Sequence, residues 1–290
     1  MMGTISDIHS IPEDAVKGKA VRYVLERRCS NGGFCFYRLE EPNSSDTFFA
    51  LSVLFLTGIE YQDKKALQYL KDRQLPDGSY ESVFQAYYCV KSLKFFHDGP
   101  VADPASFLMR SLDIYDIHLL PAEVTSIFRK MYLLMDTCQS LSIQLSKVQL
   151  LKLRRFALQY HNYDGGFGYP CSTLCETMHA VKILQWLDYP LSGLMVKHFW
   201  ESCQDSVYVF TNVPHTSLAY IEHMHAGIAL AETLNCAPLN PGSCLEFIVG
   251  CQNRNGGFAR TVNGGIATLE NSWLAIDALD RLMKIKQKNR

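Results

Sequence analysis

The sequence carries little net charge, and neither sign of charge is concentrated along it. Its 28 Lys and Arg residues nearly balance its 29 Asp and Glu residues, which leaves a formal net charge of −1. The short basic stretch from Arg281 to Arg290 is typical of a solvated helix end. Because a chain without a basic face has no electrostatic footprint for phosphate backbones, we expect no nucleic-acid partner.

Long apolar runs are also missing. The longest, Phe48 to Ile59, contains Ser52 and Thr57 and is shorter than the roughly 20 residues that a membrane-spanning helix needs. Met1 to Pro12 is polar and acidic and lacks the layout of a secretory signal. We therefore predict a cytoplasmic protein with no transmembrane segment, in which residues 1–11 and 285–290 are flexible.

The ten cysteines include no Cys-x-x-Cys pair. They are scattered through apolar segments, and Cys171 with Cys175 and Cys244 with Cys251 have helical spacings. Neither a disulfide framework nor a thiolate metal cluster is indicated by this pattern, so we expect reduced cysteines in the core.

One short frame is present several times along the chain. Glu176 to Leu184 and Glu222 to Leu230 share Glu, Met, His, Ala and Leu at identical offsets, and Asp46 to Leu54 fits the same frame. Gln85 to Leu93 and Asn271 to Leu279 are weaker copies, and in the last copy Glu270 could equally be the aligned acid. These copies indicate an internally repeated structure.

A glycine-aromatic turn precedes four of the copies. The turns lie at Asn31–Phe34, Pro76–Tyr80, Tyr163–Phe167 and Asn255–Phe258, and their second glycines fall at positions 33, 78, 166 and 257. The spacing predicts six repeats of about 45 residues, with two turns that lack glycine near Leu120 and Val207.

Each repeat reads as an amphipathic helix followed by a more apolar one. The predicted helices are Pro12–Arg28, Ser45–Gly58, Lys64–Gln74, Glu81–Phe96, Pro104–Tyr115, Ala122–Cys138, Ser146–His161, Ser172–Leu187, Leu191–Cys203, Thr216–Leu234, Leu239–Cys251 and Ala267–Lys284. This alternation predicts one all-α domain over residues 1–290, in which two layers of helices form a closed ring or an open solenoid. The polar and aromatic positions inside the apolar helices favour the ring, because they need an interior to face.

The glycine-aromatic turns and the helix pairs resemble the prenyltransferase and squalene-cyclase superfamily. The resemblance implies an (α/α)6 toroid, a double ring of six inner and six outer helices, and an isoprenoid-type substrate. Protein-prenylating members use a separate helical α subunit and an Asp-x-Cys zinc motif, but no such motif is found at an inner-helix start here. Class II terpene cyclases carry Asp-x-Asp-Asp-Thr, and the matching stretch Asn43 to Thr47 has serine at the proton donor.

The copies also place candidate functional groups at equivalent positions. Residues three apart share a helical face, so Glu176 with His179 and Glu222 with His225 form two Glu-x-x-His pairs. They offer ligands for zinc or iron, with Asp46 or Glu270 as further ligands. Without a metal, the four acids are candidate catalytic acids and bases. A purely structural role, with Glu capping a helix and His bonded to a carbonyl, is an alternative.

Aromatic residues at the same positions predict an apolar binding surface. Phe49, Tyr88 and Trp273 suit an isoprenoid chain, with His179 and His225 as further substrate contacts. The leading hypothesis is thus binding of an apolar isoprenoid-type ligand, with prenyl transfer or cyclisation as the reaction. Two alternatives remain: a non-catalytic binding or scaffold protein, and a carbohydrate-active enzyme with paired carboxylates, for which three tryptophans are few.

Overall fold

The computed structural model describes residues 13–37, 40–112, 126–205 and 209–288. The predicted turns without glycine, near Leu120 and Val207, and the predicted flexible segment 1–11 lie outside the described residues. None of the described helices is long and apolar enough to cross a membrane.

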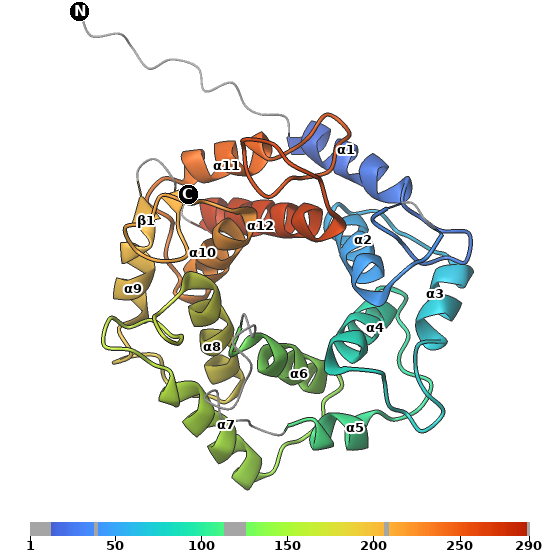
Figure 1. Cartoon of the computed structure of the whole chain (residues 1–290), viewed down its shortest axis with the longest axis horizontal. Coiled ribbons are helices and arrows are strands. Elements are labelled where there is room, and N and C mark those ends of the chain that lie inside the picture. The colour runs from blue at the N-terminus through green and yellow to red at the C-terminus, as the bar shows by residue number, and fades with distance from the viewer. Residues whose placement is uncertain (1–12, 38–39, 113–125, 206–208, 289–290) are drawn as a thin grey trace, which may run out of the picture.

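The helices form two concentric layers (Figure 1). The outer helices are α1 (Glu13–Leu25), α3 (Lys64–Lys71), α5 (Ala105–Arg110), α7 (Lys147–Gln159), α9 (Val196–Ser202) and α11 (Pro241–Gly250). The inner helices are α2 (Ser44–Leu56), α4 (Val83–Phe95), α6 (Arg129–Ser140), α8 (Leu174–Trp186), α10 (Ile221–Thr233) and α12 (Leu269–Lys288). The prediction of twelve helices in six pairs is therefore confirmed for the described part of the chain.

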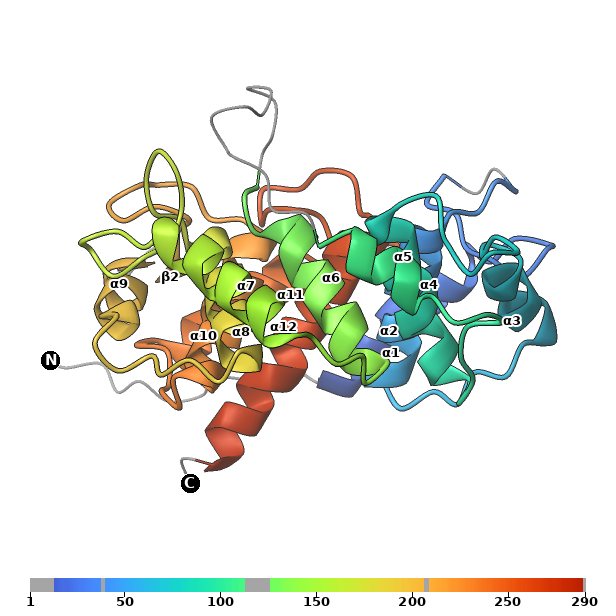
Figure 2. The same cartoon turned by 90° about the horizontal axis from the view of Figure 1, so that it is seen from below.

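The ring is closed. Each inner helix packs on the next in chain order, and α12 packs against α2, so the toroid is confirmed over the open solenoid. The last helix is longer than the other inner helices, and its C-terminal end projects beyond the ring (Figure 2). It ends at Lys288, beyond the Lys284 expected from the sequence.

One short antiparallel strand pair departs from the all-helical expectation. Strands β1 (Gln204–Asp205) and β2 (Val209–Phe210) pair Gln204 with Phe210 and Asp205 with Val209. A two-residue strand is too short to produce an alternating pattern in the sequence, which explains why it was not predicted.

The turn glycines are required by close packing between repeats. Gly32, Gly165 and Gly256 have positive φ, and a Cβ on any of them would clash with backbone of the next outer helix or the residue that precedes it. For Gly256 that neighbour is Lys19 of α1, so the last turn packs on the first helix. The Tyr23 hydroxyl strengthens this closure by donating to the Ala267 carbonyl at 2.6 Å.

A hydroxyl on the inner helix holds three of the turns. The repeated frame begins at Asp46, Glu176 and Asn271 in these three copies, and the residue that follows carries the hydroxyl. This hydroxyl accepts a hydrogen bond from the backbone amide of the buried aromatic residue in the turn: Thr47 from Phe34, Thr177 from Phe167, and Ser272 from Phe258. The turn aromatics are thus structural and link each turn to its inner helix.

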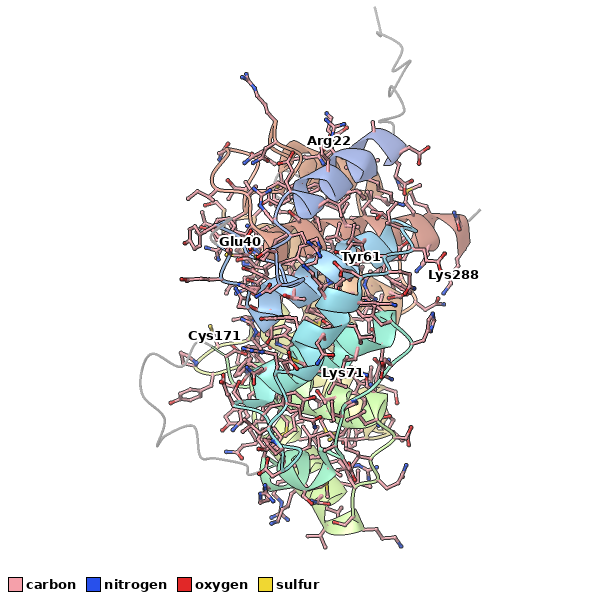
Figure 3. The ribbon with its side chains drawn as sticks, turned by 90° about the vertical axis from the view of Figure 1, so that its right-hand side faces the viewer. Arg22, Glu40, Tyr61, Lys71, Cys171 and Lys288 are labelled. Carbon is pink, nitrogen blue, oxygen red and sulfur yellow. The ribbon has the colours of Figure 1, made fainter. Side chains whose placement is uncertain are left out.

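All ten cysteines are free. Cys171 alone is exposed, and Figure 3 shows it on one face of the ring, at the left of the view. It precedes α8 rather than lying on it, so the helical spacing expected between Cys171 and Cys175 is not realised. The expectation of unpaired, mostly core cysteines is otherwise confirmed.

Candidate functional site

Each inner helix contributes one ring-bearing side chain to a band that we call the inner belt. Its members are Phe49 (α2), Tyr88 (α4), Tyr132 (α6), His179 (α8), His225 (α10) and Trp273 (α12). Tyr132, His179 and Trp273 remain partly exposed. Because the outer helices cover the opposite side of the inner layer, we infer that these exposed edges face the ring axis.

One side of the belt is aromatic. Phe49 stacks on Trp273 with ring centroids 5.3 Å apart and meets Tyr88 edge-on at 5.5 Å. Phe48 and Tyr87 back these rings, with Phe48 5.7 Å from Trp273. The predicted aromatic residues Phe49, Tyr88 and Trp273 therefore lie together, on helices α2, α4 and α12.

The other side of the belt carries imidazoles. His179 packs on Tyr132 at 4.8 Å, and His225 lies 5.4 Å from Trp273. Burial, together with the charges of Arg129 and His225, lowers the pKa of His179 to about 3. His179 is therefore neutral at physiological pH.

His225 is held by a chain of charged groups. Its Nε2 lies 2.8 Å from Oδ2 of Asp277, which also accepts a 2.6 Å hydrogen bond from Nε of Arg281. Arg281 in turn pairs with Glu232. Burial disfavours the ionised form of Asp277, but the hydrogen bond from His225 and the nearby charges outweigh it, and the pKa of Asp277 lies well below its ordinary value.

Two lysines lie one helical turn beyond the belt, towards the C-terminal ends of α4 and α8. Lys91 forms a 3.0 Å ion pair with Asp136. Lys182 is half-buried, and burial, reinforced by the charge of Arg281, lowers its pKa. Together with Asp277, Arg281 and Glu232, these groups form what we call the interior charge network.

The predicted Glu-x-x-His ligand set is not assembled. Glu176 turns to the segment just before α6, where its Oε2 accepts hydrogen bonds from the amides of Ile127 and Phe128 at 3.0 and 2.9 Å. Glu222 accepts a 2.6 Å hydrogen bond from Nε of Arg260. His179 and His225, one turn deeper, face other partners. No group of three His, Cys, Asp or Glu residues within the described part of the chain could hold a metal ion.

The reason is the position of the two acids in their helices. Both stand in the first turn, and side chains on a helix lean towards its N-terminus. The carboxylates therefore reach the rim of the ring, while the histidines stay at the level of the belt. Glu176 performs a capping role, although for the neighbouring helix rather than its own.

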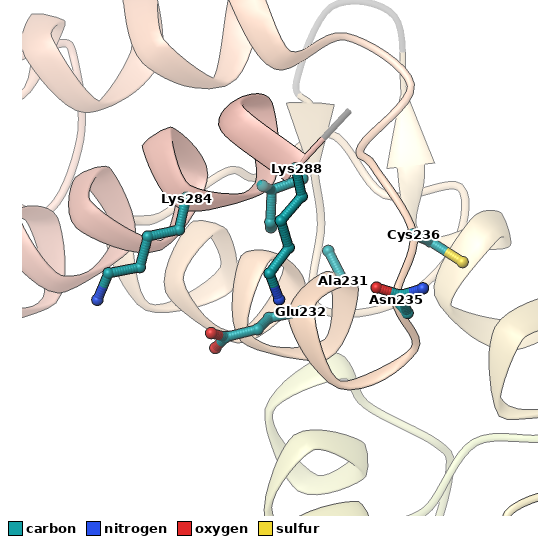
Figure 4. A pocket seen from close by; sticks show the side chains of 7 residues that line it. Ala231, Glu232, Asn235, Cys236, Lys284 and Lys288 are labelled. Atoms are coloured by element: carbon teal, nitrogen blue, oxygen red, sulfur yellow. The ribbon is translucent and has the colours of Figure 1, made fainter. Parts of the chain in front are cut away.

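Asp46 and Glu270 do lie together, at a pocket of 310 Å³ on the rim beside Phe49. We call it the entrance pocket; its lining includes Phe36, Tyr37, Phe49 and the carboxylates of Glu41, Asp46 and Glu270. Asp46 accepts the amide of Phe36 at 2.9 Å, and Glu270 pairs with Arg129 at 3.3 Å. A second hollow, between the ends of α10 and α12 (Figure 4), has a volume of only 20 Å³, room for about one water molecule.

Sequence reasoning missed several members of the site. Tyr132 belongs to a repeat whose glycine turn is not recognisable, so the frame was not extended to it. Asp277 and Arg281 lie four residues apart on α12, but Asp277 meets His225 across 52 positions of sequence. No local pattern could reveal that contact.

The geometry defines a class of protein: a closed α/α toroid whose inner helices present an aromatic and imidazole belt to the ring axis. The model of the prenyltransferase alpha-alpha toroid domain family matches residues 4–176 and 102–288, and the chain belongs to this family. The solved structure of Candida albicans protein geranylgeranyltransferase-I complexed with GGPP aligns with a TM-score of 0.40 and 17% identity, over 92% of this chain and 77% of that one. No curated protein matches the sequence.

Proposed function

We propose that the inner belt binds an apolar, isoprenoid-like molecule. The observation that carries this proposal is the stacked pair of Phe49 and Trp273 beside the entrance pocket. Aromatic faces suit the methyl and alkene groups of an isoprenoid chain, and the volume of the pocket is at the lower end of the range for small-molecule sites, about 300–1,000 Å³. Membership of the prenyltransferase toroid family supports the same ligand class.

Calorimetric titration of the purified protein with farnesol, farnesyl diphosphate and the hydrocarbon β-farnesene tests the proposal. At least one of the three compounds should bind, and Trp273→Leu should weaken its binding at least tenfold, which corresponds to about 1.4 kcal/mol. Phe55→Leu is the matched control, because Phe55 is exposed and lies outside the belt on α2. Binding of none of the compounds, or equal losses in the two variants, would overturn the proposal.

Proton transfer to or from the bound ligand is a second candidate function. It is favoured by one observation, the hydrogen bond between His225 and the ionised Asp277. Because Nε2 of His225 faces Asp277, Nδ1 is the ring nitrogen left to exchange a proton with a ligand, the arrangement used in general acid and base catalysis. Conversion of a bound isoprenoid, followed by mass spectrometry, should be lost in His225→Gln while the ligand still binds. An unchanged rate in this variant would exclude His225 as the acid or base.

A helical partner subunit and a cytoplasmic location stay predictions. Size-exclusion chromatography with light scattering of the protein isolated from its native cells would test the partner, since a heteromeric complex has a mass well above the 32.9 kDa of the chain.

A further inference from the structure

The entrance pocket is acidic. Its lining carries the carboxylates of Glu41, Asp46 and Glu270, and no lysine or arginine is among the described residues that line it. Arg129 pairs with Glu270 from outside this lining. A pocket lined by one sign of charge repels ligands of the same sign, so an anionic ligand meets an unfavourable potential here.

The interior charge network is already balanced. It contains three cationic and three anionic side chains: Lys91, Lys182 and Arg281 against Asp136, Glu232 and Asp277. Arg281 is shared between two carboxylates, which leaves Lys182 to offset the remaining negative charge. An added diphosphate would therefore give this network an excess of negative charge, and Lys182 is its only cation that is not already in an ion pair within the described residues.

The His179 ring of the belt nevertheless has polar atoms that no other group of the described residues uses. Nδ1 of His179 is shielded from solvent and has no hydrogen-bond partner among the described residues. An unpaired buried N–H is less tolerable than an unpaired lone pair, so the proton of this neutral imidazole belongs on Nε2. Nε2 of the same ring is accessible, and it forms no hydrogen bond within the described part of the chain. His179 thus presents an uncharged N–H donor next to Tyr132.

We propose that the ligand ends in a neutral oxygen, a hydroxyl or a carbonyl, which accepts a hydrogen bond from Nε2 of His179, and that prenyl diphosphates are disfavoured. The inference rests on the proposed function and narrows its substrate class to isoprenoid alcohols or ketones. The apolar chain then lies against Phe49, Tyr88 and Trp273, across the ring from the imidazole side.

Comparison of farnesol, farnesylacetone, β-farnesene and farnesyl diphosphate in the same titration tests this proposal. One neutral hydrogen bond contributes about 0.5–1.5 kcal/mol, so the preferred oxygenated compound should bind about two- to twelvefold tighter than the hydrocarbon. Farnesyl diphosphate should bind more weakly than farnesol, and added salt should reduce the difference because it screens the carboxylates. Comparison of farnesol with farnesylacetone shows whether the oxygen of the preferred ligand is a hydroxyl or a carbonyl.

His179→Phe provides the matched variant, since it keeps a ring on the belt and removes the donor. It should abolish the preference for the oxygenated compound over β-farnesene, and His179→Gln, which retains an N–H donor, should restore part of it. Circular dichroism at the same temperature checks that both variants are folded. Equal binding of farnesol, farnesylacetone and β-farnesene to the wild type, or tightest binding of the diphosphate, would overturn the inference and leave the proposed function standing. Absence of binding by all four compounds would overturn both.

Discussion

Two sides of the ring place different chemistry on the same belt. On α12, α2 and α4 the belt consists of Trp273, Phe49 and Tyr88, which pack on one another. On α8 and α10 it consists of His179, which packs on Tyr132, and His225, which lies beside Trp273 and is also hydrogen-bonded to the buried Asp277. The repeat determines where a side chain lies, whereas the residue at that place determines what the side chain can do.

The residues that hold the turns and allow the helices to pack are the same in kind on both sides of the ring. The hydroxyl that holds the turn is kept on both sides, as Thr47 on α2 and Thr177 on α8. The glycine that allows the next outer helix to approach is likewise kept, as Gly32 and Gly165. The ring therefore retains one packing scheme while its belt has two distinct halves, an aromatic one and an imidazole one.

Removal of Asp277, the carboxylate that holds His225 of the imidazole half, should have the largest effect of the series. Asp277→Ala leaves Arg281 and His225 without their shared carboxylate, and loss of one partner of a buried pair costs about 3–5 kcal/mol of unfolding free energy. Urea unfolding measures this change. Asp280→Ala, which removes a more exposed pair with Lys284 on the same helix, should cost less than about 1 kcal/mol. Equal losses in the two variants would contradict a special role for the interior network.

His179 should give the imidazole half of the belt a pH dependence that the aromatic half lacks. Its pKa is about 3 in the folded protein and 6.5 in the unfolded chain, so only the unfolded chain binds the proton between these values. Stability should therefore fall as pH decreases below about 6.5, by up to about 1.4 kcal/mol per pH unit for this one group. His179→Phe should reduce the slope measured by urea unfolding between about pH 6.5 and 5, where few carboxylates titrate. An unchanged slope would show that His179 is protonated in the folded state.

The two halves also differ in how far the sequence could predict them. The glycine turns and the frame predicted the repeat, the twelve helices and the aromatic residues Phe49, Tyr88 and Trp273, because these depend on local pattern. The pairing of His225 with Asp277 depends instead on how α10 and α12 pack. The frame placed Glu176 beside His179 on one helical face, but it could not show that the carboxylate reaches the backbone amides of the two residues just before α6.

Glu176 and Glu222 stand at the same position of the frame and should nevertheless behave differently. Glu176→Ala leaves the buried amides of Ile127 and Phe128 without their acceptor, which should cost about 2 kcal/mol. Thermal unfolding should show a clearly lower Tm. Glu176→Gln keeps an oxygen acceptor and should recover part of the loss. A variant as stable as the wild type would mean that water replaces the carboxylate at these amides.

Glu222→Ala should have the smallest effect of the series. Its partner Arg260 is more than half exposed and also lies over the ring of Tyr220, with the guanidinium carbon 3.9 Å from the ring centroid. An exposed ion pair contributes about 0–1 kcal/mol, and the contact between Arg260 and Tyr220 should survive the substitution, so the loss should stay below about 1 kcal/mol. Raising the salt concentration should reduce the difference from the wild type further, since salt screens exposed charges. A loss as large as that of Glu176→Ala, insensitive to salt, would show that the frame position itself, rather than the partner of each carboxylate, determines the contribution to stability.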